Sequence, residues 1–139
     1  AGVVAADETE KGLREILNYG HTVGHAVEVM TNFDTYKHGE AVLLGMIAAG
    51  KIALNRGMWS AEEYDRQQGL LRRIGIPKEA EDLSSEGLID RMSRDKKARD
   101  GVIRFVLPEA IGKVVSCDGV SREEMLAGIG HMKAVSGGA

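Results

Sequence analysis

The 139-residue sequence contains one cysteine, Cys117, so no disulfide bond can form within the chain. A lone cysteine fits a reducing compartment. The sequence also lacks any run close to the roughly 18 apolar residues that a membrane-spanning helix needs. Its N-terminus has no basic segment followed by an apolar one, which is the pattern of a secretion signal. These absences predict a soluble, cytoplasmic protein with no membrane partner.

An excess of basic residues is also absent. The 18 lysines and arginines are outnumbered by 21 aspartates and glutamates, which gives a formal net charge of -3. Nucleic-acid binding needs a concentrated basic surface that neutralises phosphates. We therefore expect no nucleic-acid partner and favour small-molecule chemistry. The chain begins without methionine, which predicts that it is a piece of a longer protein.

The length and the hydrophobic content of 43% are sufficient for one globular domain with its own core. Apolar residues at helical spacing predict helices, and two β-branched segments predict strands that pair as a hairpin. The helices are expected at about residues 11–30, 39–55, 60–74, 84–97 and 125–132, and the strands at 102–107 and 113–117. Residues 135–139 should fray. The expected fold is a mainly α, multi-helix domain with a small two-stranded β-hairpin.

Two of the predicted helices carry information about packing. Gly20 and Gly24 lie inside the first helix, where each costs about 1 kcal/mol relative to alanine. Their presence indicates that another backbone or a ligand approaches closely. Residues 39–55 are apolar on most faces, so this helix should be buried at the centre of the domain or at an interface. Gly57 is expected to end it.

Three of the four histidines, His21, His25 and His38, fall within the first predicted helix and the segment that returns from it. His21 and His25 are four residues apart, so both project from one helix face. This spacing suits a shared metal, or a metal beside a proton carrier. The segment lacks the His-Glu-x-x-His pattern of metallopeptidases. A single histidine is more often a hydrogen-bonded core or surface residue, and we expect that ordinary role for His131.

Polar residues flank this cluster. Arg14 lies four residues before Asn18, which lies three residues before His21, so a guanidinium and a carboxamide share the helix face of the imidazole. Arginine offers forked donors to phosphate or carboxylate, so the stripe suits an oxygen-rich anionic substrate, and a solvated helix face is the alternative. Lys96 and Lys97 end a predicted helix, where they either stabilise the helix dipole or reach an anion in the same cleft.

Several motifs, in their order along the chain, closely resemble those of 3-dehydroquinate synthase. They are Glu10-Lys-Gly-Leu-Arg14, Leu17-Asn18-Tyr-Gly-His21-Thr-Val-Gly-His25-Ala-Val-Glu28, Lys37-His38-Gly-Glu40-Ala-Val, Gly45-Met46, Asp95-Lys96-Lys97 and Ile111-Gly112-Lys113. The resemblance covers nearly the whole chain. It implies that residues 1–139 are the C-terminal, mainly helical domain of that enzyme. It also implies an N-terminal α/β domain, absent from this chain, that binds most of the NAD and supplies a glutamate metal ligand.

The resemblance implies a role for each histidine of the cluster. His21 and His38 match the two histidine ligands of a divalent zinc or cobalt ion that borders the substrate. His25 matches a histidine that transfers protons, and Glu10 matches the other proton acceptor. Glu28, one turn after His25, is either an orienting partner or an ordinary carboxylate on the helix surface.

The resemblance also implies a set of substrate-binding residues. Arg14, Asn18 and one or both of Lys96 and Lys97 match positions that hold the phosphate, carboxylate and hydroxyl groups of a phosphorylated sugar acid. Neither the motifs nor their spacing decides between the two lysines.

The implied enzyme is a phosphorus-oxygen lyase of the shikimate pathway of aromatic amino acid biosynthesis. With NAD and a metal, it converts 3-deoxy-D-arabino-heptulosonate 7-phosphate to 3-dehydroquinate and phosphate. Another sugar-phosphate cyclase, making an inosose or a cyclitol, is one alternative. A catalytically inert helical assembly module is the other, because a domain without its NAD-binding half should be inactive alone. A homodimer is possible.

Overall fold

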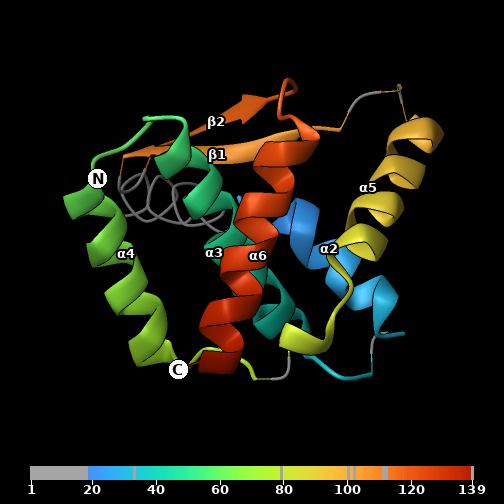
Figure 1. Cartoon of the computed structure of the whole chain (residues 1–139), viewed down its shortest axis with the longest axis horizontal. Helices are drawn as coiled ribbons and strands as arrows, with labels where there is room; N and C mark the ends of the chain where they lie inside the picture. The colour runs from blue at the N-terminus through green and yellow to red at the C-terminus, as the bar shows by residue number, and fades with distance from the viewer. Residues whose placement is uncertain are drawn as a thin grey trace, which may run out of the picture.

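The computed structural model describes residues 19–32, 34–78, 80–99, 101, 103–110 and 113–138. Within these residues the fold is mainly α-helical with a two-stranded antiparallel sheet, which confirms the predicted fold class (Figure 1). The helices are α2 (His21–Met30), α3 (His38–Asn55), α4 (Ala61–Ile74), the short 3-10 helix η1 (Ala80–Asp82), α5 (Ser85–Arg99) and α6 (Arg122–Gly138), and the strands are β1 (Phe105–Ala110) and β2 (Lys113–Cys117). In this part of the chain, no helix has both the length and the apolar character needed to cross a membrane.

Helix α3 forms the centre of the domain, as its apolar sequence predicts. Every residue from 41 to 50 is buried, and Leu44 and Ile47 are fully enclosed. The helix contacts α2, α4, α6 and β1, so neighbours cover it from several sides. In Figure 1, α6 crosses in front of α3 and the hairpin lies along the top of the view. Burial of this continuous apolar surface is the main driving force for the fold.

Three glycines allow α2 and α3 to touch backbone to backbone. A Cβ atom on Gly45 would collide with the carbonyl oxygen of Gly20 and lie 2.9 Å from the amide nitrogen of Gly24. A Cβ atom on Gly24 would lie 2.9 Å from the carbonyl oxygen of Ala41. The close approach predicted from Gly20 and Gly24 is therefore confirmed, and the approaching group is the backbone of α3. This contact fixes the two histidine-bearing helices relative to each other.

The ends of several helices follow from local sequence signals. The hydroxyls of Ser60 and Ser121 each accept a hydrogen bond, at 3.1 Å, from the backbone N–H three residues further on. Serine followed by glutamate three residues later is a local signal for the start of a helix, and these two serines are the N-caps of α4 and α6. Gly57, at φ 71°, follows α3, and Gly75, at φ 111°, ends α4. Both glycines occupy backbone conformations that other residues rarely adopt.

The first strand begins later than predicted. Strand β1 starts at Phe105 rather than at residue 102, whereas β2 has its predicted bounds. The carbonyl oxygen of Arg104 accepts a hydrogen bond from the hydroxyl of Thr22 at 2.8 Å, so the chain just before β1 is attached to α2. Pro108 continues β1 opposite Val114. A proline is tolerated there because each strand of a two-stranded sheet has a free edge.

The helix that carries His21 and His25 also begins differently from the prediction. Tyr19 and Gly20 form a turn, and α2 begins at His21, so the predicted helix over residues 11–30 does not run unbroken through this point. Residues 11–18 lie outside the described part of the chain. The carbonyl oxygen of Gly20 accepts the first helical hydrogen bond, from the N–H of Gly24 at 2.9 Å. Helix α2 therefore starts where Gly20 meets α3.

The last helix extends well beyond the predicted end at residue 132. Helix α6 continues to Gly138, so the prediction that residues 135–139 fray is wrong for the described residues. The hydroxyl of Ser136 is buried, donates to the carbonyl oxygen of Pro77 at 2.6 Å and accepts from the N–H of Ala80 at 3.1 Å. These tertiary bonds hold the final turns against the segment around η1. Helix α5 likewise ends at Arg99, two residues past its predicted limit.

Candidate metal and substrate site

Three exposed histidines gather where α2 lies beside the start of α3. His21 and His25 project from α2, and His38 is the first residue of α3. The imidazole rings of His21 and His38 have centroids 5.5 Å apart and meet edge to face, at an interplanar angle of 69°. The structure therefore brings together the two histidines that the resemblance assigns to a metal, although 17 positions separate them in the sequence.

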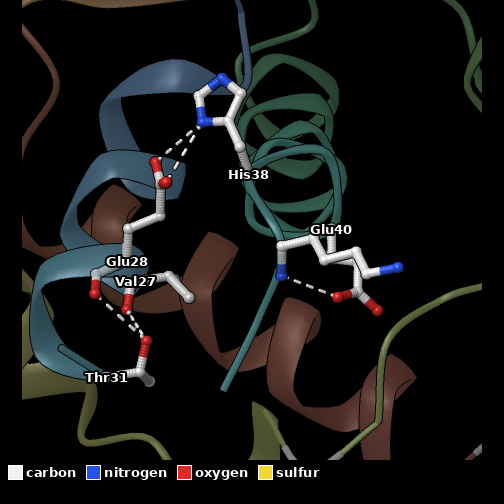
Figure 2. Close-up of polar contacts among 6 residues, drawn as sticks. Val27, Glu28, Thr31, His38 and Glu40 are labelled. Atoms are coloured by element: carbon white, nitrogen blue, oxygen red, sulfur yellow. Dashed lines mark hydrogen bonds and ion pairs between the residues drawn. The ribbon is translucent and has the colours of Figure 1, made fainter. Parts of the chain in front are cut away.

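Glu28 lies beneath this cluster and contacts His38. Its two carboxylate oxygens are 3.1 and 3.2 Å from Nδ1 of His38 (Figure 2). The Glu28 side chain is 11% exposed, whereas that of His38 is 65% exposed. The alternative of an ordinary surface carboxylate is therefore wrong for Glu28. A carboxylate can only accept, so Nδ1 of His38 donates, and in the neutral ring Nε2 keeps the lone pair.

Local hydrogen bonds support the backbone on both sides of this contact. The hydroxyl of Thr31 lies 2.8 Å from the carbonyl oxygen of Val27 and 3.2 Å from that of Glu28, at the end of α2 (Figure 2). At the start of α3, the carboxylate of Glu40 accepts from the backbone N–H of Lys37 at 2.8 Å. The two helix ends that carry Glu28 and His38 are thus each closed by a side chain.

The electrostatic environment favours the neutral form of His21. Partial burial lowers the pKa of His21, and the neighbouring His38 and His25 lower it further, while Glu28 acts in the opposite direction. Neutral imidazole is the form that binds a metal ion. His21 therefore needs to release little or no proton before it can act as a ligand at neutral pH.

Comparison with known protein families shows to which of them this chain belongs. A family model for the 3-dehydroquinate synthase C-terminal domain matches residues 1–98. The chain belongs to this family. The 3-dehydroquinate synthase of Synechococcus sp. (strain CC9605) is 49% identical over 133 residues, which are 96% of this chain and 36% of that protein. That of Gloeobacter violaceus is 54% identical over 115 residues, 82% of this chain and 32% of that protein. The chain thus spans about a third of the length of these relatives.

Solved structures of related cyclases share the fold. A 2-epi-5-epi-valiolone synthase from Streptomyces hygroscopicus subsp. jinggangensis 5008, with NAD+ and Zn2+ bound, matches with a TM-score of 0.73 at 26% identity. The match covers 83% of this chain and 32% of that one. A 2-deoxy-scyllo-inosose synthase matches with a TM-score of 0.63 at 24% identity over 81% of this chain and 32% of that one, which supports the fold alone. The described helices and hairpin therefore share their fold with about a third of each of these chains.

The structure does not describe several of the residues to which the resemblance to 3-dehydroquinate synthase assigns a role. Glu10, Arg14 and Asn18 lie outside the described residues. Lys96 and Lys97 belong to the last turns of α5, but their side chains are not described. Within the described residues, no group of three or more His, Cys, Asp or Glu side chains could hold a metal ion. A metal held by His21 and His38 would thus need a further ligand from elsewhere.

His131 lies apart from the three-histidine cluster, as expected. Its Nε2 is 2.7 Å from the hydroxyl of Tyr64, and the ring is half-buried between α4 and α6. It lines a surface pocket with Arg72 and Lys78, and this pocket contains none of the residues that the 3-dehydroquinate synthase resemblance assigns to the site. The hydrogen bond to Tyr64 gives His131 the structural role predicted for it.

Proposed function

We propose that this chain is the metal- and substrate-binding C-terminal domain of a 3-dehydroquinate synthase. The complete enzyme, a phosphorus-oxygen lyase of the shikimate pathway, would convert 3-deoxy-D-arabino-heptulosonate 7-phosphate to 3-dehydroquinate and phosphate. The observation that carries the proposal is the approach of His21 to His38, whose Nδ1 is engaged by Glu28, in a chain 49% identical to the Synechococcus enzyme. Two adjacent, exposed imidazoles are a donor set that suits zinc or cobalt.

In this proposal His21 and His38 hold the divalent metal and border the substrate. When bound, such an ion polarises the oxygens on the carbons that react. The lowered pKa of His21 keeps its imidazole in the ligand form. The Glu28 contact directs Nε2 of His38 away from the carboxylate and leaves it available for coordination.

The remaining residues position the substrate and move protons. His25 lies one turn from His21 and would transfer a proton beside the metal, with Glu10 as the second proton acceptor. Arg14, Asn18 and one or both of Lys96 and Lys97 would hold the phosphate, the carboxylate and the hydroxyls. Positioned cations and forked donors also stabilise negative charge that develops as phosphate leaves. NAD, bound mainly by an N-terminal domain, would supply the transient oxidation of a ring hydroxyl.

The proposal makes an N-terminal α/β domain the principal partner of this chain. The support is the length of the relatives, of which the chain spans about a third. It also requires that the cofactor-binding half and the third metal ligand come from that domain. A cytoplasmic location and a homodimeric assembly stay predictions.

The test is to join the N-terminal part of the Synechococcus relative to this chain and to measure both bound metal and phosphate release. We expect about one zinc or cobalt ion per chain and phosphate release from 3-deoxy-D-arabino-heptulosonate 7-phosphate. His21→Ala and His38→Ala should lose metal and activity together, because each removes one imidazole ligand. His131→Gln is the matched control, since it removes a histidine that is distant from the cluster, and it should retain metal.

Two outcomes would contradict the proposal. Retention of zinc by both His21→Ala and His38→Ala would exclude ligation by this pair. Turnover of a different phosphorylated sugar, with none of the heptulosonate phosphate, would favour another sugar-phosphate cyclase. That alternative has specific support in the fold shared with the 2-epi-5-epi-valiolone synthase, at a TM-score of 0.73.

A further inference from the structure

Glu28 is the one charged group of α2 that is buried directly beneath the exposed histidines. The whole residue is 9% exposed. The other buried polar residues in the described part of the chain, Gln67, Gln68 and Ser136, are uncharged. Burial of a carboxylate is costly unless hydrogen bonds compensate for the lost water. The compensation that the structure shows for Glu28 is the contact of both its oxygens with Nδ1 of His38, at 3.1 and 3.2 Å.

The geometry of this contact constrains the imidazole ring. Nδ1 lies almost equally far from the two carboxylate oxygens, so the ring faces the middle of the carboxylate (Figure 2). Nε2 lies on the opposite side of the five-membered ring and therefore points away from Glu28. The mostly exposed ring of His38 would otherwise have freedom to rotate, because its side chain is 65% exposed.

We propose that Glu28 is a positioning residue: its buried carboxylate fixes the tautomer and orientation of His38, so that Nε2 is presented to the metal shared with His21. Histidine ligands commonly donate their other N–H to a carboxylate, which orients the ring and makes the coordinating nitrogen a better electron donor. The metal part of this inference rests on the proposed function. The tautomer part rests only on the described contact.

A purely structural role is the competing explanation. Glu28 and His38 also connect the end of α2 to the start of α3, so their loss could weaken the helix pair without affecting any ligand. Glu40 provides the matched control, because its carboxylate closes the same end of α3 by accepting from the N–H of Lys37. Glu40→Gln perturbs the helix start but leaves the Glu28 contact with His38 intact.

The first experiment determines the tautomer of His38 in the 139-residue chain without metal. Long-range 1H–15N NMR distinguishes a protonated Nδ1 from a protonated Nε2 at neutral pH. We expect the Nδ1–H form in the unmodified chain and in Glu40→Gln. Glu28→Leu, which replaces the carboxylate with an apolar side chain of similar size, should give a mixture of tautomers. An Nε2–H form in the unmodified chain, or no change in Glu28→Leu, would overturn the inference.

The second experiment measures Zn2+ affinity by titration of the joined protein described above, in which the N-terminal part would supply the remaining ligand. The dissociation constant should rise about 10- to 100-fold in Glu28→Leu. It should rise less in Glu28→Gln, whose amide oxygen can still accept from Nδ1, and stay unchanged in Glu40→Gln. Equal affinities for the unmodified joined protein and Glu28→Leu would overturn the positioning role. Absence of Zn2+ binding by the joined protein with an unmodified cluster would instead contradict the proposed metal site itself.

Discussion

Among the titratable side chains of α2, Glu28 is buried while His21 and His25 are exposed. Its spacing places Glu28 seven residues after His21, on the same helix face, and this much is visible in the sequence. The sequence does not show that α3 covers this position or that His38 begins the covering helix. The identity of the partner, His38, depends on that packing.

The surroundings of His131 shift the pKa of its side chain. Burial, followed by the positive charges of Lys51 and Arg72, lowers the pKa of His131 below the ordinary histidine value of about 6.5. Its Nε2 is within hydrogen-bond distance of the Tyr64 hydroxyl, at 2.7 Å. The folded state therefore favours the neutral ring.

This preference predicts a contribution of His131 to the pH dependence of stability. Since the unfolded chain binds a proton near pH 6.5 and the folded chain does so only at lower pH, the free energy of unfolding should fall as the pH drops below about 6.5. His131→Gln cannot titrate and should lose this part of the decrease. Urea unfolding at about pH 7.5 and about pH 5.5 measures it. A stability difference between the two proteins that is the same at both pH values would contradict the prediction.

At the scale of secondary-structure elements, the packing of α2 on α3 determines the geometry of the site. Gly20, Gly24 and Gly45 remove the side chains that would separate the two backbones. The helix pair in turn places His38 within reach of both Glu28 and His21. Packing and candidate chemistry therefore depend on the same contact.

Gly45→Ala should destabilise the domain. The added methyl group would collide with the carbonyl oxygen of Gly20, which is backbone and cannot rotate away. Overpacking of this kind costs about 1–3 kcal/mol or more. Urea unfolding at fixed pH gives the difference in free energy.

Gly39→Ala is the control for that substitution. Gly39 also lies in α3, but a Cβ atom there would meet nothing within 4 Å. We expect no loss of stability and a gain of up to about 1 kcal/mol from the better helix propensity. Equal effects of the two substitutions would show that helix propensity, rather than contact with α2, determines the role of Gly45.

At the scale of the whole molecule, the chain has its own hydrophobic core but contributes only two of the proposed metal ligands. Helix α3 is enclosed by α2, α4, α6 and β1. The helix that carries His38 is therefore held in place by contacts within the chain. The chain nevertheless spans only 36% of the Synechococcus relative. The remaining proposed metal ligand and the NAD site would both lie outside it.

The chain alone should therefore give no detectable turnover of 3-deoxy-D-arabino-heptulosonate 7-phosphate, even with added NAD and zinc. Without the second domain, nothing holds the cofactor beside the substrate, and the loss of that positioning removes many orders of magnitude in rate. A phosphate-release assay on the 139-residue chain tests this, with the joined protein as positive control. Measurable turnover by the chain alone would contradict the requirement for an N-terminal domain.

The sequence by itself determined the properties that depend on neighbours within a few positions. Apolar periodicity and Gly57 predicted most helix ends, because each signal acts through local backbone geometry. The serine caps of α4 and α6 act in the same local way. The ordered motifs around His21, His25 and His38 determined the family. Gly20 and Gly24 even predicted the close approach of another backbone or a ligand, although not which of the two.

Only the tertiary structure decided the properties that depend on distant segments. Ser136 extends α6 through bonds to Pro77 and Ala80, and the Thr22 bond to Arg104 attaches α2 to the chain just before β1, whose strand begins only at Phe105. The partner of Glu28 belongs to the same class, because the approach of His38 follows from the packing of α3 on α2. Such contacts join residues that are far apart in the chain, and local propensity carries no information about which of them will meet.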